Sequence, residues 1–204
     1  EIARIEAGED LLYLSNFSLA ETLNYLYDFF KPAADEKGLS FVCNRQVKGD
    51  AAMIRSDSQK LTGIMTNLIN NAIKFTASGT VEFGDLIENQ NLILYVKDTG
   101  IGIPDDRKEA IFERFVQADL NITRGYEGLG LGLSIVKAHV DSLGGSITLE
   151  SQSGRGTEFR VTIPYNPVKE KPVAQQQADK EKDVFGVRGA TILVVDDDEI
   201  NLQY

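Results

Sequence analysis

The stretch that begins at Asp98 limits most strongly what this chain can fold into, because it joins a strand to a helix through two runs of glycine. An alternating apolar run at residues 92–96 predicts a strand that ends at Asp98, and the first glycine run, residues 100–102, follows directly. The second run, residues 128–132, opens an amphipathic helix. Glycine lets backbone N–H groups approach a ligand, and a helix N-terminus favours phosphate. The long loop between the runs, residues 105–127, predicts a lid.

The composition is that of a soluble globular protein, because 42% of the 204 residues are hydrophobic and 25% are charged. This length suffices for one well-buried domain with extra segments. The net charge of -10 argues against a nucleic-acid-binding surface, so we expect no nucleic-acid partner. Cys43 is the only cysteine, which excludes a disulfide within the chain and predicts a small buried residue.

Apolar periodicity and turn residues predict helices and strands along the chain. Ser18, with Glu21 three residues later, forms a capping box and predicts a helix that Gly38 ends. Asp57 begins the best-defined helix, which ends at residues 74–76. The other predicted elements are the end of a helix at residues 1–9, strands at residues 11–14, 39–44, 51–55, 80–87, 91–97, 146–151 and 158–163, and a helix after residue 132.

The helix that begins at Asp57 carries polar side chains that could bind a ligand. Asn67 and Asn71 stand four residues apart, so both amides lie on one face. Asn71 can offer its amide oxygen to magnesium, a hard ion that takes few protein ligands, although an amide bonded to neighbouring backbone explains it equally well. Lys74 suits a phosphate or plain solvent, and Phe75 by itself reads as a core residue.

The glycine-rich stretch also offers ligand-binding groups. Asp98 ends a strand with an acceptor-only carboxylate that suits the exocyclic amine of adenine, although by itself a turn-forming Asp is the simpler interpretation. Alternating Gly128, Gly130 and Gly132 at a helix start favour anion binding over a plain linker. The only histidine, His139, reads as a structural or surface residue. The P-loop and the strand–Gly-x-Gly-x-x-Gly–helix unit are both absent, so a nucleotide site must be built another way.

Five motifs, in this order and spacing after Asp57, resemble the catalytic boxes of the sensor histidine kinases of two-component systems. They are residues 67–76 (Asn-Leu-Ile-Asn-Asn-Ala-Ile-Lys-Phe-Thr), 98–104 (Asp-Thr-Gly-Ile-Gly-Ile-Pro), 111–115 (Ile-Phe-Glu-Arg-Phe), 128–136 (Gly-Leu-Gly-Leu-Gly-Leu-Ser-Ile-Val) and 154–157 (Gly-Arg-Gly-Thr). The resemblance covers about residues 1–165. Residues 192–198, Ile-Leu-Val-Val-Asp-Asp-Asp, resemble the first strand and acidic cluster of a receiver domain, which implies a hybrid kinase.

The resemblance implies an α+β two-layer sandwich, in which a mixed β-sheet packs on three helices, as in the Bergerat-type fold of gyrase, heat-shock chaperones and MutL. It implies ATP and magnesium as ligands, with Asp98 on the adenine amine and Asn71 on the metal. Asn67, Lys74 and Arg114 would be the catalytic groups. The nucleotide-contacting set that it implies is Asn67, Asn71, Lys74, Phe75, Asp98, Gly100, Gly102, Ile103, Gly128, Leu129, Gly130, Leu131, Gly132 and Thr157.

The same resemblance implies four parts. Residues 1–10 would end a dimerisation helix, residues 11–165 would form the ATP-binding catalytic domain, residues 166–189 a linker, and residues 190–204 the start of the receiver. The family's acceptor histidine lies on a helix of the same or the partner chain, upstream of this sequence, so we expect nucleotide binding without self-phosphorylation. We expect this piece to be a monomer and the longer parent protein a homodimer anchored in the cell membrane, with the kinase on the cytoplasmic side.

Two other functions fit parts of the pattern. A hydrolytic ATPase of the same superfamily would carry Glu four residues before the magnesium-binding asparagine, and Asn67 at that position favours transfer over hydrolysis. A degenerate module that uses the fold only for protein contacts would not need Asn71, Asp98 and the alternating glycines. Glu127 and Leu129 stand where many relatives have Gly and Thr, so the contacts of the lid are open.

Overall fold

The computed structural model of the protein describes residues 11–113 and 131–168, all within the first of two compact units, Glu1–Lys169. In chain order its elements are β1 (Ser15–Ser18), α2 (Leu19–Glu36), β2 (Ser40–Arg45), η1 (Gly49–Ala52), β3 (Met53–Ser56), α3 (Ser58–Phe75), β4 (Thr80–Glu88), β5 (Asn91–Asp98), η2 (Asp105–Arg107), η3 (Ala110–Phe112), α4 (Gly132–Ser142), β6 (Ser146–Gln152) and β7 (Gly156–Pro164). None of the helices in these residues is long and apolar enough to cross a membrane.

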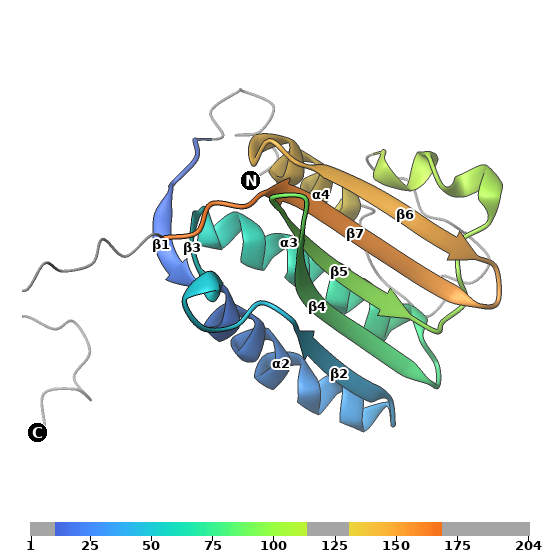
Figure 1. The fold of residues 1–204 in the computed structure, drawn as a ribbon. Coiled ribbons are helices and arrows are strands. Elements are labelled where there is room, and N and C mark those ends of the chain that lie inside the picture. The colour runs from blue at the N-terminus through green and yellow to red at the C-terminus, as the bar shows by residue number, and fades with distance from the viewer. Residues whose placement is uncertain (1–10, 114–130, 169–204) are drawn as a thin grey trace, which may run out of the picture. The chain divides into compact units, whose positions relative to one another are not determined.

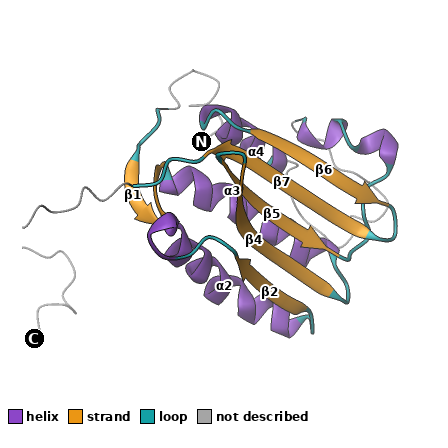
Figure 2. Cartoon of the chain, viewed as in Figure 1, coloured by secondary structure: helices purple, strands orange, loops and turns teal. Residues whose placement is uncertain are grey.

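A five-stranded sheet with the order β2-β4-β5-β7-β6 forms one layer of the domain. The β2–β4 pair is parallel and the other three pairs are antiparallel, so the sheet is mixed. Helices α2, α3 and α4 cover one face of it (Figure 1), and the separation of helices from strands into two layers is plain in Figure 2. The predicted two-layer α+β fold is therefore confirmed.

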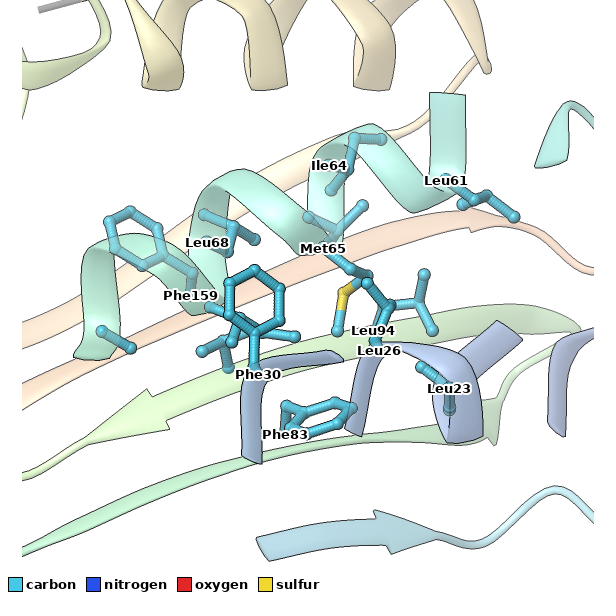
Figure 3. Packing of buried hydrophobic residues seen from close by; sticks show 14 of the residues in the cluster. Leu23, Leu26, Phe30, Leu61, Ile64, Met65, Leu68, Phe83, Leu94 and Phe159 are labelled. Carbon is cyan, nitrogen blue, oxygen red and sulfur yellow. The ribbon is translucent and has the colours of Figure 1, made fainter. Parts of the chain in front are cut away.

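The hydrophobic core lies between the helices and the sheet. Figure 3 shows side chains of α2 and α3 directed toward Phe83, Leu94 and Phe159, which come from β4, β5 and β7. Phe83 and Leu94 are 0% exposed. Burial of one such side chain contributes roughly 1.5–3 kcal/mol relative to exposure, so the apolar stripe of α3 fixes that helix firmly against the sheet.

Both predicted helix starts are confirmed by their capping hydrogen bonds. The Ser18 hydroxyl accepts the Glu21 N–H at 3.2 Å at the start of α2. At the start of α3, Asp57 Oδ1 accepts the Lys60 N–H at 3.0 Å. Each cap satisfies an N–H group that has no partner within the first turn of the helix.

The predicted strand at residues 11–14 is wrong, because β1 begins only at Ser15. Residues 11–14 are apolar, which favoured a strand, but their side chains are 44–64% exposed. The strand is decided by pairing: β1 lies antiparallel to β3, with Ser15 opposite Ser56 and Ser18 opposite Met53. The strand predicted at residues 51–55 likewise begins later, because residues 49–52 form the 3₁₀ turn η1.

The other edge of β3 pairs with residues that follow the large sheet. The Arg55 N–H donates to the Asn166 carbonyl, and the Val168 N–H donates to the Met53 carbonyl, both at 2.8 Å. Pro167 lies opposite Ile54 in an antiparallel bridge. The first residues of the predicted linker are thus bound to the domain, and β3 lies between the segment that enters the domain and the segment that leaves it.

Candidate functional site

Asp98 ends β5 in the middle of the sheet, between Val81 of β4 and Thr157 of β7. The side chain is 9% exposed, and its Oδ1 accepts the Gly100 N–H at 2.8 Å. Burial raises the pKa of the Asp98 carboxyl, and the backbone N–H groups of Gly100 and Thr157 oppose that rise. The carboxylate is therefore fixed in place and still has acceptor capacity for a ligand's N–H group.

The loop after Asp98 is anchored on two sides by its backbone. On one side, the Ile101 N–H donates to the Phe75 carbonyl at the end of α3, at 3.3 Å. On the other side, the Ile101 carbonyl accepts the Gly154 N–H at 2.7 Å, from the turn between β6 and β7. These contacts join the end of α3 to the loop that follows Asp98.

Two of the predicted glycines are required by close approach. A Cβ at Gly100 would overlap the Phe75 carbonyl. Gly102 has φ of +67°, and a Cβ there would overlap the Gln152 carbonyl. Both positions therefore exclude any side chain, which brings the backbone of the loop close to its neighbours and to whatever binds beside Asp98.

Ile103 and Thr157 meet through Ser151, a residue that the sequence analysis missed. The Ser151 hydroxyl accepts the Ile103 N–H at 2.8 Å and donates to the Gly156 carbonyl at 2.9 Å. Its oxygen lies 3.0 Å from Thr157 Oγ1, and because Ser151 has given its one proton to Gly156, Thr157 is the donor of this pair. No local pattern marks Ser151, whose role comes from pairing between β6 and β7.

The start of α4 lies against the polar face of α3. A Cβ added to Gly132 would lie 2.9 Å from Asn67 Oδ1, so the end of the second glycine run directly neighbours this amide. Asn67 Nδ2 donates to the Gly63 carbonyl at 2.9 Å, which orients the side chain. Two of the predicted site residues, Asn67 and Gly132, are thus brought together, and Leu131 precedes Gly132 at the helix start.

Asn71 lies one turn further along α3 and is half-buried. Its amide has no hydrogen-bonding partner among the residues that the structure describes, in contrast to Asn67. The competing interpretation, an amide tied to neighbouring backbone, therefore does not apply within the described part of the chain. A half-buried carboxamide oxygen with spare acceptor capacity suits a magnesium ion whose other ligands are water and phosphate.

The C-terminal end of α3 brings a cation and an aromatic ring beside this amide. Lys74 Nζ lies 5.1 Å from the centre of the Phe75 ring, and both side chains are half-buried. Phe75 is therefore not a fully buried core residue. Lys37 Nζ donates to the carbonyls of Ile73 and Lys74, at 2.8 and 3.2 Å, which stabilises the negative end of the helix dipole.

The remaining predicted site residues, Arg114, Gly128, Leu129 and Gly130, lie outside the described residues, as does most of the predicted lid. The segment that leads to it is ordered by packing. Ile111 of η3 is buried, and the Phe112 ring meets Phe159 of β7 edge-on at 6.3 Å between centroids.

His139 is 4% exposed on α4, next to Gly63 of α3, in keeping with a structural histidine.

A sequence model described as the histidine kinase-, DNA gyrase B- and HSP90-like ATPase family matches residues 56–167. The autoinducer 2 sensor kinase/phosphatase LuxQ of Vibrio parahaemolyticus is 36% identical over 212 residues, covering 98% of this chain and 24% of that protein. The hybrid signal transduction histidine kinase D of Dictyostelium discoideum is 40% identical over 173 residues, covering 82% of this chain and 11% of that protein.

The fold has a solved counterpart in full-length ShkA, crystallised in complex with AMPPNP. The two structures superpose with a TM-score of 0.73 and 30% sequence identity, over 82% of this chain and 34% of that one. The chain therefore spans about a quarter or less of these curated relatives and about a third of that solved chain.

Proposed function

Because the chain belongs to the histidine kinase-, DNA gyrase B- and HSP90-like ATPase family, we propose that it is the ATP-binding catalytic domain of a hybrid sensor histidine kinase. In the longer protein it transfers the γ-phosphoryl group of ATP to a histidine outside this chain. A receiver aspartate, also outside this chain, then takes the phosphoryl group. The kinase part functions in a homodimer on the cytoplasmic side of a membrane.

One observation carries the proposal. The carboxylate of Asp98 and the polar face of α3 belong to one connected unit, because the Ile101 N–H binds the Phe75 carbonyl at 3.3 Å. A ligand held by both needs an amine that donates to a carboxylate and a chain of anionic groups that reach α3. Adenosine triphosphate has this combination, with the exocyclic amine at one end and the phosphates at the other.

The residues near α3 suit phosphoryl transfer, which depends mostly on positioning and charge neutralisation. Asn71 would hold magnesium, and Lys74 would contact a phosphate. Magnesium, when bound, neutralises phosphate charge and orients the phosphate oxygens. Asn67, oriented by the Gly63 carbonyl, lies beside the helix start at Gly132, where backbone N–H groups and the helix dipole favour anions.

Hydrolysis by this domain is the less favoured alternative. A general base for water must lie within hydrogen-bond reach of that water. The residue four positions before Asn71 is Asn67, a neutral amide that accepts no proton at physiological pH. Transfer to a protein histidine, which needs no activated water, therefore fits α3 better than ATP hydrolysis does.

Calorimetry with AMPPNP, with and without magnesium, tests nucleotide binding directly. Wild type is expected to bind, and Asp98→Asn is expected to bind about 30-fold more weakly, since a hydrogen bond to a charged group contributes about 2 kcal/mol. Asp28→Asn, at an exposed position on α2, is the matched control and should bind as wild type does. No binding by wild type, or equal binding by Asp98→Asn, would favour a module used only for protein contacts.

Phosphoryl transfer needs a second assay. Radiolabelled ATP is mixed with this chain and with a separately supplied histidine-bearing helical hairpin of the parent protein. We expect label on the hairpin as acid-labile phosphohistidine and none on this chain. Stable phosphohistidine on this chain, or rapid ATP hydrolysis without hairpin labelling, would contradict the kinase assignment.

A further inference from the structure

The carboxylate of Asp57 binds two parts of the chain that are far apart in sequence. Its Oδ1 caps α3 by accepting the Lys60 N–H at 3.0 Å. Its Oδ2 accepts the Tyr13 N–H at 2.9 Å, across 44 residues of sequence. The Asp57 side chain is 2% exposed and each of its oxygens has a defined partner, with the Lys60 bond buried and the Tyr13 bond partly buried. Asp57 therefore ties the entering segment to the first turn of α3.

The entering segment, residues 11–14, has few other attachments to the described residues. The side chains of Leu11, Leu12, Tyr13 and Leu14 are 44–64% exposed. Among these four residues, only Tyr13 donates its backbone N–H to a described residue. The bond to Asp57 is thus the main fixed point between the segment and the domain before β1 begins.

Helix α3 carries any displacement of this end to the candidate nucleotide site. Asn71 lies 14 residues beyond Asp57, about 21 Å along the helix axis at 1.5 Å per residue. Ile64 and Leu68, between the two, are 0–1% exposed, and close packing makes the helix move as one body. At the far end, the Phe75 carbonyl accepts the Ile101 N–H of the loop after Asp98. Both halves of the site are therefore attached to α3.

We propose that Asp57 is a positioning residue that couples the entering segment to the nucleotide site through α3. Nucleotide binding then strengthens the Tyr13–Asp57 bond, and the bond raises nucleotide affinity by the same factor, because a coupling free energy is reciprocal. In the longer protein the chain upstream of Tyr13 thereby has a mechanical connection to the nucleotide. The inference rests on the proposed nucleotide-binding function.

Two substitutions remove the bond from opposite sides. Asp57→Asn keeps an oxygen for the Lys60 N–H, and Asn is as good a helix cap as Asp, but its amino group cannot accept the Tyr13 N–H. Tyr13→Pro removes the N–H and leaves Asp57 intact. Leu12→Pro is the matched control, since the Leu12 N–H has no partner among the described residues.

Calorimetry with AMPPNP and magnesium on the whole chain gives the first test. Asp57→Asn and Tyr13→Pro are each expected to weaken binding about fivefold, the lower end of typical couplings between sites. The double variant should be no weaker than either single variant, because both remove one bond. Leu12→Pro should stay within twofold of wild type. Additive losses in the double variant, or an equal loss in the control, would overturn the proposal.

Amide hydrogen exchange gives the second test, because it distinguishes a coupling through Asp57 from general stabilisation of the domain. AMPPNP should slow exchange of the Tyr13 amide about fivefold more than that of the Val168 amide, which binds the other edge of β3. In Asp57→Asn this difference should vanish. Equal slowing of both amides in wild type reports only overall stabilisation and would overturn the proposal. Failure of wild type to bind AMPPNP would instead overturn the proposed function.

Discussion

The proposed purine side, around Asp98, and the proposed phosphate side, on the polar face of α3 at Asn67 and Asn71, are built differently. Around Asp98, protein groups already hold the backbone: Phe75, Ser151 and Gly154 all bind the loop of residues 99–104. On the polar face of α3, Asn67 is oriented by one hydrogen bond, and Asn71 has none to a described residue. One side is complete in the protein, and the other has side chains with spare bonding capacity.

This difference indicates how the two sides would recognise a ligand. A preformed loop binds a flat base without a further cost of ordering, which favours specificity for one base. The Asn71 amide, which has no partner among the described residues, can adapt to phosphates and their metal ion, whose charge and hydration change during phosphoryl transfer. Substitutions on the purine side should therefore affect folding and binding together, whereas those at Asn71 should affect binding alone.

The largest effect is expected from Gly102→Ala, which should displace the loop after Asp98 and so disrupt the proposed purine side of the site. The positive φ and the overlap with the Gln152 carbonyl together predict a loss of about 3 kcal/mol in the free energy of unfolding. AMPPNP affinity should fall about 100-fold, because the loop after Asp98 must move. Urea titration and calorimetry measure the two losses.

Gly154→Ala is the control for this substitution, because Gly154 also has positive φ, +77°, but has open space around the Cβ position. Gly154→Ala should lower the free energy of unfolding by only about 1 kcal/mol and should bind AMPPNP as wild type does. If Gly102→Ala behaved like Gly154→Ala, the loop would not be tightly held, and the contrast between the two sides would fail.

A smaller effect, confined to binding, is expected from Asn71→Ala. Loss of the proposed magnesium ligand should weaken AMPPNP binding about tenfold with magnesium and leave adenosine binding unchanged. Since the Asn71 amide has no partner among the described residues, the free energy of unfolding without ligand should stay within about 0.5 kcal/mol of wild type. A large destabilisation of the unliganded protein, or equal loss with and without magnesium, would show that Asn71 has a structural role instead.

The smallest effect, a change in pH dependence, should come from Asp85, which tests what burial alone does to a carboxylate. Asp85 is 0% exposed on β4, and its Oδ1 accepts the N–H groups of Gln46 and Val47 at 2.7 and 3.1 Å. Its Oδ2 is buried without a hydrogen-bonding partner in the described part of the chain. Burial raises the pKa of Asp85 above its ordinary 3.8, and the two N–H groups and Arg45 oppose the rise.

A raised pKa means that the folded protein binds this proton more tightly than the unfolded chain does. The stabilising contribution is therefore fully present below the ordinary value and is lost as the pH rises through the folded-state value. Relative to Asp85→Asn, wild type should gain free energy of unfolding as the pH falls from 7 toward 4, measured by urea titration at each pH. AMPPNP binding at pH 7 should be the same in both. If the free energy of unfolding of wild type fell relative to that of Asp85→Asn as the pH is lowered, the direction of the predicted pKa change would be wrong.

The parts of the fold that local chemistry determines could be predicted from the sequence. Ser18 and Asp57 begin helices because each side chain caps the N–H three residues later, a relation visible in the sequence. The turn at residues 89–90, between the strands predicted at residues 80–87 and 91–97, has positive φ at both positions. The strand at residues 11–14 was wrong because pairing with β3, and not apolar composition, decides where β1 begins.

The contacts that complete the site join residues distant in the chain and had no signal in the sequence. Ser151 contacts Ile103 across 48 residues, and Asp57 contacts Tyr13 across 44. Asp98, Asn67 and Gly132 were predicted from the order and spacing of motifs that resemble the histidine kinase boxes, whereas each residue alone was a weaker signal. The support around them depends on which strands become neighbours, which short-range periodicity does not specify.

The pairing of residues 166–168 with β3 has a consequence for any shortened version of this protein. A chain that ended at residue 165 would expose one edge of β3, with the Arg55 N–H and the Met53 carbonyl left without their partners. Bare strand edges are templates for addition of a strand from another molecule. Such a chain would tend to self-associate, and retention of three more residues would prevent it.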